Sequence, residues 1–240
     1  MSRFFVGSES IDVDQAHIHG SDVHHIRDVL RLKAGDKLTL IDESATEFAC
    51  EISEIHSDHI TARIVSSHQP LKAVPYLALF QGIPKGRKLD LVVEKATELG
   101  VDRITPVLCE RSVPRPDSSS DSRLRRWRRI AQSAAKQCRR ASIPEITGPM
   151  GWPELTEELR DFDRVVVFWE AATEPVDSAL ADFEGRRLAI LIGPEGGLAA
   201  SEVDSLMALG AKPAWLGPRI LRTETAPIVA LAIVNFILKR

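Results

Sequence analysis

Hydrophobic and polar residues alternate along three short segments in the first 70 residues of the chain. The segments are KLTLID (37–42), EFACEIS (47–53) and HITARIV (59–65), and turn residues such as Ala34-Gly35-Asp36 lie between them. Alternation with a period of two is typical of strands that bury one face. The first part of the chain therefore predicts a small β domain.

A short amphipathic helix is predicted within this β domain. Ser21 occupies the position of an N-cap. The residues that follow separate into an apolar face and a basic face, with Val23, Ile26 and Leu30 on the first and His24, Arg27 and Arg31 on the second. The basic face indicates contact with phosphate, and an ordinary solvated helix face explains the same pattern.

After a linker at 66–75 the pattern changes to apolar runs that alternate with amphipathic segments. We predict strands at 76–80, 103–108, 164–169, 188–193 and 213–217. Continuous apolar strands separated by helices are typical of a parallel α/β sheet. The sequence thus predicts two domains, over residues 1–72 and 73–240.

Three helices of the second domain have clear sequence signals. Residues 86–100 have an apolar face and end at Gly100, which suits a left-handed stop. A second helix is predicted from Ser201 as N-cap, with Val203, Leu206 and Met207 inward and Gly210 at its end. The third, APIVALAIVNFIL (226–238), is apolar throughout but shorter than the roughly 20 residues of a membrane span. We expect it to be a buried helix and predict no membrane segment.

The composition of the chain limits the class of protein and the compartment that we expect. The formal net charge is −3, so a surface for nucleic acid has to come from local clustering of basic residues. Cys50, Cys109 and Cys138 lie far apart, which fits neither a disulfide framework nor a zinc site, and no other metal-ligand spacing occurs. The N-terminal residues lack the pattern of a signal peptide. We expect a cytoplasmic protein without a metal.

A glycine-rich turn joins a predicted strand to a predicted helix in LIGPEGGLAASEV (191–203). It lies at the carboxyl end of the strand, where open α/β sheets bind ligands. It matches neither the dinucleotide fingerprint nor a P-loop, so neither a nicotinamide nor a triphosphate is indicated. Glycines allow the backbone to approach a flat ligand closely. A tight structural connection remains the alternative interpretation.

The segment LGPRILRTETAP (216–227) follows the next strand and leads into the apolar helix. Thr223 or Thr225 can cap that helix, and Pro227 suits its first turn. Capping does not explain the charges of Arg219, Arg222 and Glu224. This concentration of polar groups beside the glycine turn favours a binding site at the mouth of the sheet.

A third segment is strongly basic. RLRRWRRIAQSAAKQCRR (123–140) contains eight basic residues and no acidic one, and Trp127, Ile130 and Ala134 can form an apolar side. Such a helix suits a polyanion. Lys85, Arg87 and Lys88 also indicate an anion-binding site. Cations at a helix N-terminus are repelled by the positive end of the helix dipole, and a bound anion would offset this repulsion.

These motifs resemble the bacterial small-subunit ribosomal RNA uridine-N3 methyltransferases of the SPOUT class. The resemblance covers RFFV (3–6), HHIRDVLRLKAGD (24–36), QGIPKGRKLDLVVEKATELGV (81–101), CERSV (109–113), AAKQCRRASIPEI (134–146), LIGPEGGLAASEV and LGPRILRTETAPIVALAIV (216–234). GPEGG followed by LGPRILRTETA is its most specific part. Lys136 departs from the family, in which glutamate is expected at this position.

The resemblance implies an α/β protein with an N-terminal PUA-like β-barrel that binds RNA and a trefoil-knotted parallel-sheet methyltransferase domain. The sequence pattern alone would have suggested an ordinary doubly wound sheet. The implied cofactor is S-adenosylmethionine, the implied substrate is 16S ribosomal RNA or the small ribosomal subunit, and the implied assembly is a homodimer. The implied reaction methylates N3 of a uridine.

The resemblance also assigns residues to these functions. Arg222 is expected to stabilise the uridine anion, with Glu224 or Glu195 as proton acceptor. The expected cofactor residues come from the two loops: Leu191, Ile192, Gly193, Pro194, Glu195, Gly196, Gly197, Leu216, Gly217, Ile220, Leu221, Arg222, Thr223, Thr225 and Ala226. The expected RNA contacts are basic: Arg3, His24, Arg27, Arg31, Lys85, Arg87, Arg125, Arg128, Lys136 and Arg139.

Three alternatives remain open at this point. The same chemistry could act on a different RNA nucleotide. A nucleotide-dependent oxidoreductase or ligase would bind NAD or ATP in place of the methyl donor, although both fingerprints are missing. A non-catalytic RNA-binding module would keep the basic surface without methyl transfer.

Overall fold

A computed structural model describes residues 2–69, 74–112 and 120–239 of the chain, with the side chain of residue 120 excepted. The chain divides into two compact units. One comprises Met1–Lys72 with Lys136–Ser142, and the other comprises Ala73–Ala135 with Ile143–Arg240.

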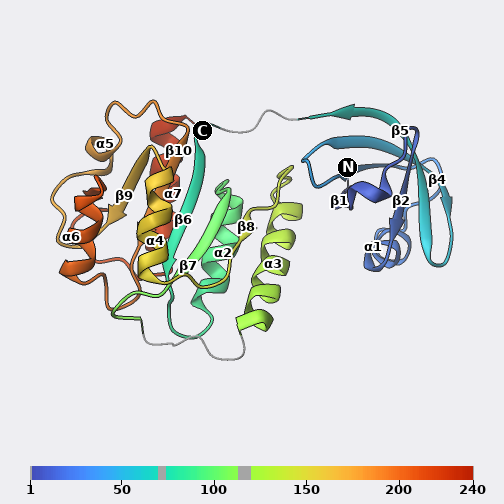
Figure 1. Cartoon of the computed structure of the whole chain (residues 1–240). Helices are drawn as coiled ribbons and strands as arrows, with labels where there is room; N and C mark the ends of the chain where they lie inside the picture. The colour runs from blue at the N-terminus through green and yellow to red at the C-terminus, as the bar shows by residue number, and fades with distance from the viewer. Residues whose placement is uncertain (1, 70–73, 113–119, 240) are drawn as a thin grey trace. The chain divides into compact units, whose positions relative to one another are not determined.

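The N-terminal unit is built on a curled five-stranded sheet (Figure 1). Its strand order is β1-β3-β4-β5-β2, with β1 parallel to β3 and the other pairs antiparallel. The strands are β1 (Ser2–Phe5), β2 (Gln15–His19), β3 (Lys37–Ile41), β4 (Glu47–Ile55) and β5 (His59–His68). Three short helical segments accompany them: η1 (Ser8–Ser10), α1 (Ser21–His24) and η2 (His25–Val29).

The alternation seen in the sequence produces the core of this unit. Leu38, Leu40, Ile52, Ile60 and Ala62 point to one side of the sheet and are buried. Val23 and Ile26 of the predicted helix pack against them. The three strands predicted here are therefore confirmed, together with the apolar helical face at these two positions.

Three details of the N-terminal prediction differ from the structure. Ser21 is the first residue of α1 and not its cap, because Gly20, with φ of 73°, makes the turn that begins the helix. Leu30 is 37% exposed, since the helix ends at Val29 before Leu30 can turn inward. Of the predicted linker, Ser66 to His68 belong to β5, and residues 70–73 lie outside the described part of the chain.

The C-terminal unit contains a six-stranded sheet in which all strands are parallel. The order is β11-β9-β10-β6-β7-β8. The strands are β6 (Tyr76–Gly82), β7 (Arg103–Val107), β8 (Glu145–Ile146), β9 (Arg164–Phe168), β10 (Arg187–Ile192) and β11 (Lys212–Ala214). β6 and β10 are buried on both faces, as expected for central strands of a parallel sheet.

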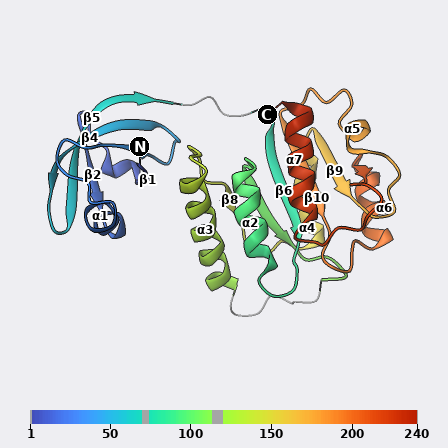
Figure 2. The same cartoon turned by 180° about the vertical axis from the view of Figure 1, so that it is seen from behind.

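Helices cover both faces of this sheet and make three layers (Figures 1 and 2). The core on one face joins the sheet to α2 (Lys88–Glu98), α3 (Ser120–Gln137), α5 (Val176–Ala179) and α7 (Ala226–Leu238). The core on the other face joins it to α4 (Trp152–Glu158), η3 (Leu159–Asp161) and α6 (Ala200–Ala208). The predicted α/β sheet is therefore confirmed.

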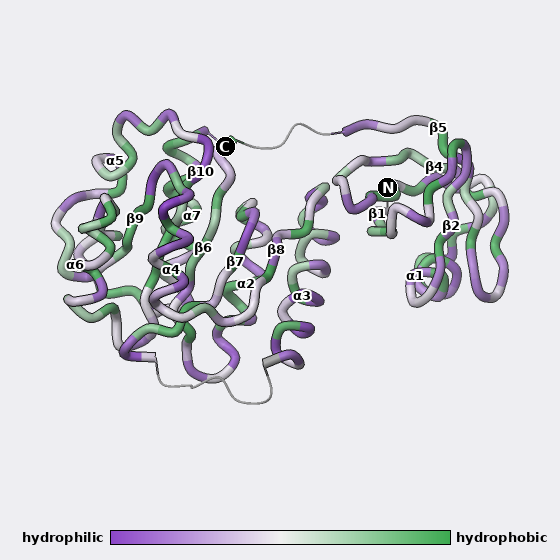
Figure 3. The backbone as a smooth tube through the Cα atoms, in the orientation of Figure 1, coloured by the Kyte–Doolittle hydropathy of each residue, from purple (hydrophilic) through white to green (hydrophobic). Residues whose placement is uncertain are grey.

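The basic segment forms the amphipathic helix that its pattern predicts. Figure 3 shows hydrophilic and hydrophobic residues alternating along α3. Trp127 and Ala134 are buried, and Ile130 packs against the core beside them. The arginines therefore occupy the remaining faces of the helix.

Several predicted ends of elements in this unit differ from the structure. β11 stops at Ala214, and Leu216 and Gly217 leave the sheet to line a pocket. The cap of α6 is Ala199 and not Ser201, because the Glu202 carboxylate accepts a hydrogen bond from the Ala199 amide at 2.9 Å. Met207 is 48% exposed and does not face the core.

Candidate functional site

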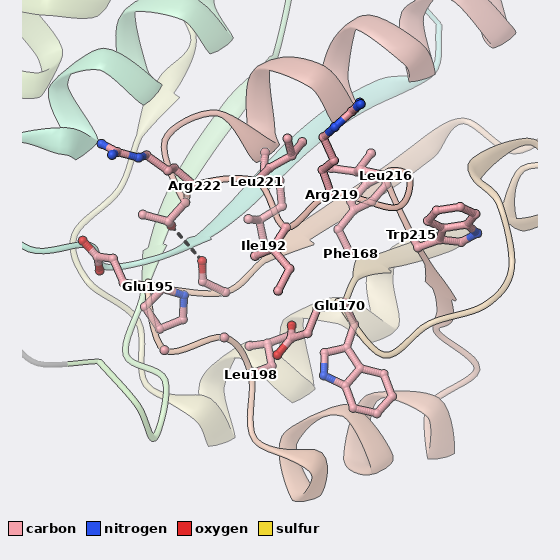
Figure 4. A pocket seen from close by; sticks show the side chains of 18 of the residues that line it. Phe168, Glu170, Ile192, Glu195, Leu198, Trp215, Leu216, Arg219, Leu221 and Arg222 are labelled. Carbon is pink, nitrogen blue, oxygen red and sulfur yellow. Dashed lines mark hydrogen bonds between the residues drawn. The ribbon is translucent and has the colours of Figure 1, made fainter.

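A pocket of about 630 Å³ opens at the carboxyl ends of β9 and β10 and beside β11 (Figure 4). Residues 168–170, 192–198 and 215–223 line it, together with Lys88 and Ala226. The two loops that the sequence singled out therefore meet at one cavity. This edge of a parallel sheet is where such folds bind ligands.

The glycine loop lies directly against strand β6. A Cβ atom on Gly82, the last residue of β6, would come within 2.5 Å of the backbone nitrogen of Pro194. Gly197 has a φ of +69°, which L-residues with side chains adopt at a cost. A side chain at Gly82 or Gly197 would therefore disturb the backbone conformation of residues 193–197.

A buried hydrogen-bond network joins the two loops. The Thr223 hydroxyl donates to the Gly193 carbonyl at 2.9 Å. The amide of Gln81, which is fully buried, donates to the same carbonyl at 3.3 Å and to the Thr223 hydroxyl at 3.1 Å. Thr223 therefore connects the loops, and the N-cap position of α7 belongs to Thr225, whose side chain makes no capping hydrogen bond. Sequence reasoning missed Gln81, because a glutamine within an apolar strand gave no sign of its partners.

A charged cluster borders the pocket where Lys88 meets the two loops. Glu195 accepts hydrogen bonds from the Lys88 ammonium at 2.8 Å and from the Lys85 amide at 3.0 Å. Burial opposes the ionisation of Glu195, but the hydrogen bonds from Lys88 and from backbone amides outweigh it, so the pKa of Glu195 is lowered. The Lys88 ammonium also lies 3.5 Å from Glu224 Oε2. Both predicted acids are therefore close to the same cation.

Arg222 lies on the rim of the pocket and extends into solvent. Its side chain is 83% exposed, and its guanidinium lies 3.9 Å from Glu224 Oε1. Figure 4 shows this guanidinium and that of Arg219 turned away from the centre of the cavity. A substrate bound over the rim would therefore meet Arg222 before it reached the pocket.

One wall of the pocket was not predicted from the sequence. Phe168, Trp169 and Glu170 follow β9, and Trp215 follows β11. These residues are also at carboxyl ends of strands, so the rule that selected the glycine loop could have found them. Figure 4 shows the Glu170 carboxylate near the glycine loop.

Two predicted pocket residues do not line the cavity. The side chain of Leu191 is buried in the core between the sheet and the helices α4 and α6. Thr225 stands at the N-cap position of α7 and is not among the residues that line the cavity. The other predicted loop residues all contribute to the lining.

In the C-terminal unit, the predicted RNA contacts are exposed. Lys85 and Arg87 lie on the turn before α2, and Arg125 and Arg128 lie on α3. Arg128 donates one hydrogen bond, at 3.4 Å, to the Ile146 carbonyl. These side chains remain accessible to a polyanion.

In the N-terminal unit, several predicted contacts already have acidic partners. Arg3 pairs with Glu47, and both Arg27 and His24 pair with Asp28. Arg31 and Arg139 are exposed and adopt positive φ angles of 54° and 61°.

Lys136 also has partners in the N-terminal unit. Its ammonium lies 3.1 Å from Asp22 and 5.6 Å from the centre of the Phe4 ring. A glutamate at position 136 would place two carboxylates together here. The pair with Asp22 therefore gives Lys136 a structural role within this unit.

The described ranges hold neither a metal site nor a membrane-spanning helix. No group of histidine, cysteine, aspartate and glutamate side chains there has the arrangement of a metal site. None of the helices described is long and apolar enough to cross a membrane. Burial raises the pKa of Cys50 to about 11 and that of Cys109 to about 12, so neither thiol is an active nucleophile near neutral pH.

Two family models match the chain. An RNA methyltransferase domain matches residues 72–235, and an RNA methyltransferase PUA domain matches residues 18–65. Together with the curled sheet described above, the second match confirms the expected PUA-like N-terminal domain.

Curated relatives extend the similarity to nearly the full chain. The ribosomal RNA small subunit methyltransferase E of Bacillus subtilis is 33% identical, over 98% of this chain and 96% of its own. The protein of the same name from Mycobacterium bovis is 34% identical, over 94% of this chain and 87% of its own.

Solved structures agree with these relatives. The ribosomal RNA small subunit methyltransferase E of Neisseria gonorrhoeae, bound to S-adenosyl methionine, is 27% identical with a TM-score of 0.83, over 99% of this chain and 98% of its own. A Legionella pneumophila protein with bound cofactor SAM is 29% identical with a TM-score of 0.86, over 98% of this chain and 96% of its own.

Proposed function

Since the chain belongs to the RNA methyltransferase family that includes the ribosomal RNA small subunit methyltransferase E proteins, we propose that it methylates N3 of a uridine in small-subunit ribosomal RNA, with S-adenosylmethionine as the methyl donor. One observation carries the proposal. A single cavity has an apolar wall from three strand ends and a charged rim of lysine, glutamate and arginine.

The residues of the cavity fit this donor. Its volume lies within the range of small-molecule sites, and aromatic and aliphatic side chains such as Phe168, Ile192 and Leu216 can enclose an adenine ring. The closely packed backbone of residues 193–197 leaves amides and carbonyls available to a flat ligand. We assign the lining residues of the two loops to donor binding.

When bound, S-adenosylmethionine supplies the methyl group. Uridine N3 forms a bond to the methyl carbon as the bond between that carbon and the sulfonium sulfur breaks, and the electron pair of the broken bond stays on sulfur. The chain has to orient the acceptor and to remove the N3 proton. Arg222 donates hydrogen bonds to a flanking uracil carbonyl as negative charge develops there. Glu224 or Glu195 accepts the proton.

RNA binding is assigned to the basic residues predicted above. Lys85, Arg87, Arg125 and Arg128 are exposed in the unit that contains the pocket, which supports their role as phosphate contacts. A paired uridine cannot present N3 to the pocket, so we infer that the target base is unpaired or flipped out.

A homodimer is part of the proposal. Helix α7 is apolar along its length, yet Phe236 is 85% exposed, and Ile220 in the second loop is 89% exposed. Exposed aromatic and aliphatic side chains of this size indicate a protein contact surface. A second copy of the chain would cover them and bring its own residues toward the pocket. We also propose that the chain is threaded as a trefoil knot here and that the enzyme acts in the cytoplasm.

The proposed function is tested by label transfer from tritiated S-adenosylmethionine to naked 16S RNA and to small subunits from cells that lack the gene. The expected product after digestion is 3-methyluridine. Because a methyl group at N3 blocks base pairing, reverse transcriptase should stop one residue before the modified base in RNA from wild-type cells only.

Other outcomes decide between the alternatives. A different methylated nucleoside would show that the same chemistry acts on another base. RNA binding without label transfer to either substrate would identify a non-catalytic RNA-binding protein.

A further inference from the structure

The lysine that begins α2 connects three parts of the pocket rim. The Lys88 ammonium lies 2.8 Å from Glu195 of the glycine loop and 3.5 Å from Glu224 of the second loop. Lys88 itself lines the cavity and is 36% exposed. One cation thus contacts both carboxylates that could accept the uridine proton.

The two carboxylates are held very differently. Both oxygens of Glu195 already accept hydrogen bonds, Oε1 from the Lys88 ammonium and the Lys85 amide, and Oε2 from the same amide at 3.2 Å. In Glu224, Oε2 is buried and lies 3.5 Å from the Lys88 ammonium, whereas Oε1 lies 3.9 Å from the exposed guanidinium of Arg222. Oε1 is therefore the Glu224 oxygen that a substrate at the rim can reach, while both oxygens of Glu195 already accept hydrogen bonds.

We propose that Lys88 is a positioning residue for methyl transfer: it fixes Glu195 against the turn before α2 and orients Glu224 as the carboxylate that takes the N3 proton. The inference rests on the proposed function, since it assigns roles within the same site. Glu195 then has a structural role at the rim, and the proton leaves uridine N3 for Glu224.

The other charged groups around the rim cannot replace Lys88. Arg222 is 3.9 Å from Glu224 but largely in solvent, and Arg219 is exposed. Arg111 donates a hydrogen bond to the Gly196 carbonyl at 3.0 Å. Glu170 adds a further negative charge to the lining. Without Lys88, the two carboxylates would repel each other across the mouth of the pocket.

The experiment compares Lys88→Met and Lys88→Arg with a matched control, Lys95→Met. Lys95 lies on the same helix, is 35% exposed, and also contacts two glutamates, Glu94 at 2.7 Å and Glu98 at 2.8 Å, but it does not line the pocket. Loss of either lysine removes the same charge from α2. Only the loss of Lys88 should affect proton removal.

For Lys88→Met we expect kcat at pH 7 to fall about tenfold or more, while the affinities for S-adenosylmethionine and RNA are retained. Without the ammonium, the Glu224 carboxylate is no longer held in place beside the substrate, so the loss should appear in kcat while KM for RNA stays unchanged. Lys88→Arg should restore most of kcat, because guanidinium keeps the charge. Lys95→Met should match the wild type.

A second measurement does not depend on activity. In protein with ¹³C-labelled glutamate carboxyls, the signal of Glu195, assigned by Glu195→Gln, should titrate at higher pH in Lys88→Met than in the wild type. This follows because the hydrogen bond from Lys88 lowers the pKa of Glu195. The Lys95→Met protein should show no such change.

The outcomes that overturn the inference differ from those that overturn the function. An unchanged kcat with weaker RNA binding would make Lys88 a phosphate contact. An unshifted Glu195 titration would show that the pair does not form. If the wild-type protein transfers no methyl group, the function fails, and the carboxyl titration still reports on the pair.

Discussion

Arg222 reaches solvent from a loop whose neighbouring residues are packed into the pocket. A guanidinium turned away from the cavity can meet an RNA base, while we expect the donor to contact this residue through its backbone. In Arg222→Ala, we expect donor binding measured by calorimetry to persist and kcat to fall about 100-fold, because one hydrogen-bond donor to the developing negative charge is lost.

Arg160→Ala is the matched control for this variant. Arg160 is also exposed, at 61%, and pairs with Glu157 on the opposite face of the sheet. Normal methylation by Arg222→Ala would refute the assigned role, and loss of activity in both variants would point to a general effect of removing surface arginines.

At the scale of single residues, the sequence predicted which loops form the pocket more accurately than which side chains contact each other. The charges of Arg222 and Glu224 were recognised because capping could not explain them, whereas Thr223, expected as a possible cap, joins the two loops. Gln81 was missed because its partners are distant in sequence, at Gly193 and Thr223. A role for Lys88 beyond anion binding required knowing that Glu195 and Glu224 come together beside it.

At the scale of elements, β6 holds the two pocket loops together through one side chain. Gln81→Leu keeps the approximate size of the side chain but removes its hydrogen bonds to Gly193 and Thr223. We expect a loss of about 1–3 kcal/mol in the free energy of unfolding, measured by urea denaturation, and weaker donor binding.

Gln15→Leu provides the control, because Gln15 is an exposed strand residue of the N-terminal unit. If Gln81→Leu binds the donor as tightly as the wild type does, the network does not shape the pocket. An equal loss of stability in Gln15→Leu would trace the effect to the substitution of glutamine on a strand.

The predicted elements were most accurate where hydrophobic periodicity alone determines the structure. The strands at β6, β9 and β10 and the helix α2 lie where expected, because each buries an apolar face or run. The ends of elements were less accurate, since they depend on contacts with other segments. Glu202 caps α6 and also accepts a hydrogen bond from the Glu110 amide at 2.7 Å, a partner that no local pattern reveals.

At the scale of the whole molecule, basic residues concentrate on one helix of a chain with net negative charge. If Arg125 and Arg128 each neutralise one phosphate, replacing both with alanine should reduce the slope of log affinity against log salt by about 1.4 to 1.8. Filter binding with 16S RNA over a range of salt concentrations measures this slope.

The control replaces two exposed basic residues outside α3, Arg160 and Lys212. Its slope should equal that of the wild type. Identical slopes for the two double variants would mean that net charge, and not the position of the charges on α3, determines RNA binding.

The exposed aromatic residue of α7 gives a test of assembly. Phe236→Glu places a charge on a surface that we propose is covered by a second copy. Burying an unpaired carboxylate is costly, so we expect sedimentation to show a monomer where the wild type is a dimer. A monomeric wild-type protein, or a dimeric variant, would rule out this face as the interface.

The contact between Gly82 and Pro194 limits how such a pocket can diversify. The glycine loop packs directly against the backbone of β6 at Gly82. A larger residue at position 82 would therefore displace the loop and the side chains on it. New ligand preferences are therefore more accessible through the residues that follow β9 and β11, Phe168, Trp169 and Trp215, whose side chains line the cavity. Evolution of the cavity in related lineages should leave one side almost fixed while the other drifts.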